Sequence, residues 1–181
     1  DVNKAASAFN PEKLLWLNQQ HLMKAEPRMV LPYLRRQLIL LGVGESDDEF
    51  LCKVIVAQRE RVKTLKEMAA NSRFLFDDRL IWDQQAVAKH LAGDGRSMLG
   101  AVRAALAALA EWSPEAINQA LKLVASTAGT GLGKVAQPLR VAVTGTTISP
   151  PIDVTLALLG RAKTLARVDV ALGFDFDRAK N

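Results

Sequence analysis

The chain contains little cysteine, little histidine and few aromatic side chains. Its 181 residues include one cysteine, Cys52, and two histidines, His21 and His90, and aromatic residues make up 6%. A single cysteine excludes an internal disulfide framework and a cysteine-cluster zinc site. The two histidines lie far apart, and no cluster of His, Cys and Asp has the spacing of metal ligands. Scarce aromatics argue against a flat base-stacking platform for RNA.

Long hydrophobic runs are also absent. The longest apolar stretches, residues 38–43 and 101–110, are too short to span a bilayer. The chain begins at Asp1 without an initiator Met or an apolar signal core, so we expect a cytoplasmic protein cut from a longer one. The formal net charge is +5, which permits a polyanionic partner without requiring one. With 49% hydrophobic and 24% charged residues, the composition is that of a globular protein.

Helical periodicity runs along nearly the whole chain. Asn10, Pro11 and Glu12 are typical of a helix start, with an N-cap amide, a first-turn proline and a first-turn acid. A second helix is predicted to begin near Pro32, and residues 46–49 are expected to cap a third that continues past residue 62. Later helices are predicted near residues 84–91, 97–111, 114–126 and 134–143, with a final pair ending near residue 172. No convincing strand pattern occurs, so the predicted fold class is all-α.

Residues 71–78 interrupt this helical pattern. They contain two acids, Asp77 and Asp78, and present no amphipathic face. We therefore predict two small helical bundle subdomains, residues 1–75 and residues 76–181.

A glycine-rich loop at residues 128–134 invites comparison with a phosphate-binding loop. Ala128 stands where a Walker A loop needs glycine, Val135 stands where it needs Ser or Thr, and no strand precedes the loop. The sequence therefore favours a flexible connection between helices. Cys52 falls on the apolar side of a predicted helix, which is typical of an inert buried thiol, and no catalytic residue is predicted.

Positive charge is concentrated in one short segment. Residues 53–66 contain a single acid, Glu60, and five cations: Lys53, Arg59, Arg61, Lys63 and Lys66. If the helix continues, Arg59, Lys63 and Lys66 share one face and Arg61 points elsewhere. Two interpretations stay open: a solvated helix face, or a phosphate-tracking surface with Arg61 free to contact a base edge.

Two segments resemble glutamyl-tRNA synthetases, which are class I aminoacyl-tRNA synthetases. Residues 13–18, Lys-Leu-Leu-Trp-Leu-Asn, resemble the helix that follows the catalytic half of that family. Residues 133–145, followed by Ser149-Pro150-Pro151, are similar to the family's C-terminal signature. The family's two ATP-handling motifs, of the His-Ile-Gly-His and Lys-Met-Ser-Lys-Ser types, do not occur. The resemblance implies the C-terminal, anticodon-binding portion of a bacterial enzyme, with the helical architecture called an α-helical cage.

The resemblance also implies a function and a set of partners. The expected partner is the anticodon stem-loop of tRNA(Glu), with no DNA, membrane, metal or cofactor bound by this portion. The parent enzyme is expected to be a monomer that uses ATP and magnesium. Two alternatives stay open: a helical protein-interaction module without RNA binding, and the same module from a synthetase that also charges tRNA(Gln).

Site residues follow from the resemblance position by position. An arginine that reads the third anticodon base aligns with Arg61, with Arg59 as the alternative if the alignment shifts. Positions that approach the anticodon bases align with Arg140, Ser149, Pro150 and Ile152. Lys134 and Gln137 are expected to face the same groove, or else to solvate the start of a helix.

Overall fold

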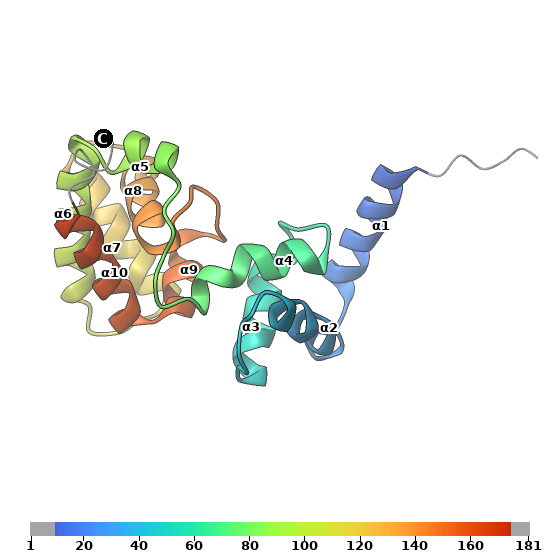
Figure 1. Ribbon diagram of the computed structural model, residues 1–181. Helices are drawn as coiled ribbons and strands as arrows, with labels where there is room; N and C mark the ends of the chain where they lie inside the picture. The colour runs from blue at the N-terminus through green and yellow to red at the C-terminus, as the bar shows by residue number, and fades with distance from the viewer. Residues whose placement is uncertain (1–9, 175–181) are drawn as a thin grey trace, which may run out of the picture. The chain divides into compact units, whose positions relative to one another are not determined.

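The protein consists of two compact helical units in a computed structural model that describes residues 10–174 (Figure 1). The units are Asp1–Ala70 and Asn71–Asn181, whereas the sequence pattern placed the boundary after residue 75. Regular structure in the described range is helical throughout, which confirms the predicted fold class. Within that range no helix is both long enough and apolar enough to cross a membrane.

The first unit is built around a pair of packed helices. Its elements are α1 (Pro11–Lys24), α2 (Pro27–Leu40), α3 (Asp48–Gln58) and the start of α4 (Leu65–Ser72). Helices α2 and α3 pack on each other. Their core residues recur at helical spacing and are almost fully buried: Val30, Leu34, Leu38, Leu51, Val54 and Ile55. Burial of these side chains is the main stabilising term available to so small a unit.

Helix starts in this unit follow the capping residues. The Asn10 side chain accepts a hydrogen bond from the Lys13 amide at 3.1 Å, and Asp47 accepts one from Phe50 at 2.8 Å. Each cap satisfies an amide that has no partner inside its helix. Both predicted starts are confirmed.

Two predictions about this unit are wrong. Pro32 lies inside α2, which begins at Pro27. Because proline has no N–H, the helix loses one backbone hydrogen bond near its start, where the exposed backbone can bind water instead. Helix α3 ends at Gln58, so residues 59–64 form a loop. The predicted face shared by Arg59, Lys63 and Lys66 therefore does not exist.

The second unit surrounds one central helix (Figure 1). Helix α8 (Leu132–Thr144) is almost entirely buried from Val135 onward and packs against several others. Those others are α5 (Gln84–His90), α6 (Asp94–Ala107), α7 (Pro114–Thr127), α10 (Arg161–Gly173) and the 3₁₀ turn η1 (Arg73–Leu75). Helix α9 (Ile152–Leu159) packs against α7 and α10. The buried stretch of α8 fixes the position of the loop that follows it.

A buried arginine joins the start of this unit to its centre. Arg167 is 6% exposed, and its Nη1 donates to the Val143 carbonyl at 2.7 Å. Its Nη2 donates to the carbonyls of Phe74 at 2.8 Å and Asp77 at 2.5 Å. Burial lowers the pKa of the Arg167 guanidinium, and the nearby carboxylates of Asp77 and Asp78 oppose that shift. Arg167 thus satisfies a carbonyl in the last turn of α8, where a helix leaves acceptors without partners.

Gly145, which ends α8, is predicted to tolerate no side chain. Its φ is +81°, and a Cβ there would lie 2.4 Å from the Ile81 carbonyl oxygen. Gly129 has a similar φ of +61° but nothing within 4 Å of that position. Gly129→Ala should cost about 1 kcal/mol for the left-handed conformation alone. Gly145→Ala should cost at least about 2 kcal/mol more, because the backbone must also move.

Urea unfolding of the two variants measures this difference directly. Equal losses of unfolding free energy would show that the contact between residues 81 and 145 contributes nothing.

Candidate nucleic-acid interface

The loop at residues 59–64, between α3 and α4, presents the predicted base-reading arginine to solvent. The Arg61 amide donates to the Gln58 carbonyl at 2.9 Å and closes a turn after α3. The next side chain, Val62, is 1% exposed and anchors the loop in the unit, whereas Arg61 and Lys63 are exposed. Because the buried Val62 side chain holds the loop backbone in place, the Arg61 side chain extends into solvent from a fixed backbone position.

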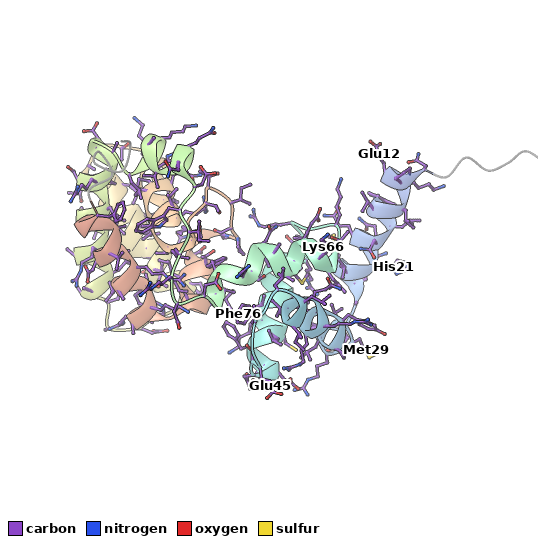
Figure 2. The ribbon with its side chains drawn as sticks, in the orientation of Figure 1. Glu12, His21, Met29, Glu45, Lys66 and Phe76 are labelled. Carbon is purple, nitrogen blue, oxygen red and sulfur yellow. The ribbon has the colours of Figure 1, made fainter. Side chains whose placement is uncertain are left out.

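Side chains on both flanks hold this loop. From α1, Gln19 Nε2 donates to the Glu60 carbonyl at 3.0 Å, and Asn18 Nδ2 donates to the Lys63 carbonyl. From α4, Glu67 Oε2 accepts the Lys63 amide at 2.7 Å and the Thr64 amide at 3.3 Å. The Glu67 amide in turn donates to Thr64 Oγ1 at 3.1 Å, which completes a capping box. Lys66, on the first turn of α4, is exposed beside the loop (Figure 2).

The loop at residues 145–151, between α8 and α9, is held mainly by hydroxyl groups of its own residues and of the helices on either side. Thr146 Oγ1 donates to the Ile148 carbonyl at 3.0 Å. Thr144 Oγ1 lies 2.8 Å from the Arg140 carbonyl and 3.1 Å from the Thr146 carbonyl. The Gly145 carbonyl accepts the Asp83 amide at 2.8 Å, which ties the loop to the segment before α5.

Arg140 reaches from α8 into this loop. Its Nε donates to Ser149 Oγ at 2.9 Å, and Ser149 Oγ donates to the Pro150 carbonyl at 2.8 Å. Thr155 Oγ1, on α9, lies 3.1 Å from both Ser149 Oγ and the Pro150 carbonyl. The structure thus brings Arg140, Ser149 and Pro150 together.

Burial separates the residues that support this loop from those that can touch a ligand. Ser149, Pro150 and Ile152 are buried, and Arg140 is half-buried. The exposed surface comes from their neighbours: Thr146, Thr147, Pro151 and Ile148, whose side chain is 72% exposed. Sequence reasoning missed Ile148, although an isoleucine directly before Ser-Pro-Pro in a predicted turn was a readable signal. It also missed Gln19 and Thr155, whose contacts are long-range or depend on loop geometry.

Lys134 and Gln137 line a different part of the second unit. They border an open groove of about 940 Å³ between α8 and the helices α5 and α6. Its other polar lining includes Lys89, His90 and Ser97, whereas Arg140 and Ser149 do not line it. Burial and the charge of Lys89 lower the pKa of His90. Gln137 Oε1 is buried without a hydrogen-bond partner in the described structure.

These three places supply cations, amide groups and apolar surface. Across residues 10–174, no group of three or more His, Cys, Asp or Glu side chains is placed to hold a metal ion. Together these cations, amides and apolar groups can bind a polyanionic ligand that also exposes polar edges.

A family model for the anticodon-binding domain matches residues 25–172. The chain belongs to the anticodon-binding domain family. Glutamate–tRNA ligase 1 of Alkalilimnicola ehrlichii is 48% identical to it over 172 residues, which cover 95% of this chain and 36% of that protein.

Solved structures agree with this membership. The glutamate–tRNA ligase of Elizabethkingia meningosepticum superposes with a TM-score of 0.80 at 27% identity, over 91% of this chain and 32% of that one. The glutamate–tRNA synthetase of Elizabethkingia anophelis superposes with a TM-score of 0.78 at 27% identity, over 92% of this chain and 32% of that one. The anticodon-binding domain described here spans about a third of the length of these relatives. The resemblance to the C-terminal portion of glutamyl-tRNA synthetases is confirmed.

Ser149 is predicted to stabilise the domain through its buried hydrogen bonds. Ser149→Ala removes the acceptor of Arg140 Nε and should lower the unfolding free energy by about 1–3 kcal/mol. The matched control is Thr147→Ala in the same loop, at an exposed side chain, which should change it by less than about 0.5 kcal/mol.

Urea unfolding monitored by circular dichroism gives both values. A Ser149→Ala loss no larger than that of the control would contradict the supporting role assigned to Ser149.

Proposed function

We propose that this anticodon-binding domain binds the anticodon arm of tRNA(Glu) within a longer glutamyl-tRNA synthetase. Its role is to position that tRNA for glutamylation at a catalytic site elsewhere in the longer protein. ATP and magnesium serve that catalytic site, and this domain contributes recognition alone. The observation that carries the proposal is Arg61, an exposed arginine on a loop held from both flanks, in a chain of this family.

Arg61 has the chemistry to read one anticodon base. Bases in an anticodon loop can be splayed out of the stack, which exposes the edges that pair in a duplex. A guanidinium offers five N–H donors in a planar fork, which suits the acceptor edge of a cytosine-type base. Because residues 60 and 63 are hydrogen-bonded on either side, little backbone freedom is lost when Arg61 binds.

The loop at residues 145–151 supplies a second contact for the same RNA. Ile148 and Pro151 present exposed apolar surface on which an unstacked base can rest. Arg140, Ser149, Pro150 and Ile152 hold that surface in place from inside the unit. Lys134, at the groove beside α5 and α6, is exposed and able to pair with a backbone phosphate, whereas the amide oxygen of Gln137 is buried beside it.

One observation favours a second candidate, a protein-interaction module. The outer face of α2 exposes Met29, Tyr33 and Leu40, which are 71%, 65% and 72% exposed (Figure 2 labels Met29). Exposed apolar side chains gathered on one helix face fit a protein partner, although the exposed Arg36 lies at the same helical spacing. The two candidates predict different results for binding of tRNA at increasing salt.

The first test is binding of fluorescently labelled tRNA(Glu) to the domain at increasing salt. The proposal predicts binding that weakens as salt rises, because each phosphate contact releases a counterion. If the domain binds no tRNA(Glu) at low or moderate salt, the RNA-binding proposal is wrong and the protein-interaction candidate is favoured.

The second test concerns Arg61. Arg61→Gln should lower the preference between tRNAs that differ only at the third anticodon base by about tenfold, the loss expected for one forked base contact. Arg36→Gln, at an exposed arginine on α2, is the control and should leave the preference unchanged.

Equal affinity of the unaltered domain for both tRNAs would favour a synthetase that also charges tRNA(Gln). A clear preference that Arg61→Gln leaves intact would remove Arg61 from the reading of that base.

A further inference from the structure

The inner face of α1 combines apolar and amide side chains. Leu15, Asn18, Gln19 and Leu22 follow one another at helical spacing and lie on one face of α1. Leu22 is 6% exposed and packs into the first unit, whereas Leu14 and Trp16, on other faces, are more than half exposed. In the middle of this face, where apolar residues would be expected, the sequence has two amides.

Both amides bind the loop that carries Arg61, across long sequence separations. Gln19 Nε2 donates to the Glu60 carbonyl at 3.0 Å, and Asn18 Nδ2 donates to the Lys63 carbonyl. These two carbonyls lie on either side of Arg61 and Val62. Carbonyls in a loop have no partner from regular secondary structure, so a side-chain donor is an effective way to fix them.

The rest of the loop is fixed at other atoms. Val62 is buried, the Arg61 amide is bound to the Gln58 carbonyl, and Glu67 binds the amides of Lys63 and Thr64. These contacts hold the loop at amides and at a side chain. The α1 amides hold the carbonyls of residues 60 and 63, which share their peptide planes with the amides of Arg61 and Thr64. Both ends of the segment from Arg61 to Lys63 are therefore bound at a carbonyl and at an amide.

We propose that Asn18 and Gln19 are positioning residues for base recognition and act through Arg61. By fixing the carbonyls of residues 60 and 63, they set the direction in which the Arg61 side chain leaves the loop. This inference rests on the proposed function of Arg61. It extends the recognition site to a helix whose own side chains need not touch RNA.

The test combines hydrogen exchange with RNA binding in the double variant Asn18→Ala/Gln19→Ala. The matched control is Gln20→Ala, since Gln20 neighbours Gln19 on α1 and its side chain makes no hydrogen bond in the described part of the chain. In the double variant the amides of residues 61–64 should exchange faster, whereas those of α3 should not change. The control should leave both sets unchanged.

The RNA measurement asks whether the amides act through Arg61. In the double variant the preference at the third anticodon base should fall by about fivefold, the effect of losing roughly one net hydrogen bond. In an Arg61→Gln background the same double change should have no further effect on that preference.

Three results would overturn the inference. One is unchanged exchange at residues 61–64 in the double variant, and this result does not depend on RNA binding. Another is an unchanged base preference in the double variant while Arg61→Gln lowers it, which would leave the proposed function intact. The third is an equal loss of preference with and without Arg61, since the amides would then act elsewhere. If the unaltered domain binds no tRNA at all, the proposed function fails and this inference fails with it.

Discussion

The buried guanidinium of Arg167 is the interaction on which the second unit depends. It binds carbonyls from the segment that opens the unit, Phe74 and Asp77, and a carbonyl from the last turn of α8. A buried charge is costly unless its donors are satisfied, and Arg167 Nε has no hydrogen-bond partner in the described structure. The three carbonyls bound by Nη1 and Nη2 therefore supply the compensation, and removing any of them would leave more of that cost unmet. Arg167 therefore fixes the end of α8, from which the loop at residues 145–151 emerges.

The two candidate loops are fixed in similar ways, although they belong to different units. Each follows a helix packed into its core and is anchored by buried side chains, Val62 in one and Ser149 in the other. Each also has backbone groups bound by side chains of a neighbouring helix, Gln19 in one and Thr155 in the other. An RNA ligand then meets surfaces whose ordering was completed during folding, which lowers the entropic cost of binding.

Local sequence signals predicted the helices better than the loops. Caps such as Asn10 and Asp47 act within a few residues, and they marked helix starts correctly. The continuation of α3 past Gln58 was mispredicted because Val62 and Leu65 keep a helical spacing, while the loop is stabilised by amides more than forty positions away. Arg61 is a candidate site residue through family resemblance alone, and the hydrogen bonds that hold its loop were not predicted, since tertiary contacts of this kind leave no local pattern.

Whether one RNA contacts both loops can be measured by amide NMR of the domain with the anticodon stem-loop of tRNA(Glu). Binding of one RNA to both loops should shift the amide signals of residues 61–63 and of residues 146–148 with the same affinity, and both affinities should weaken as salt rises. Shift changes confined to the exposed face of α2, or no changes in either loop, would contradict it.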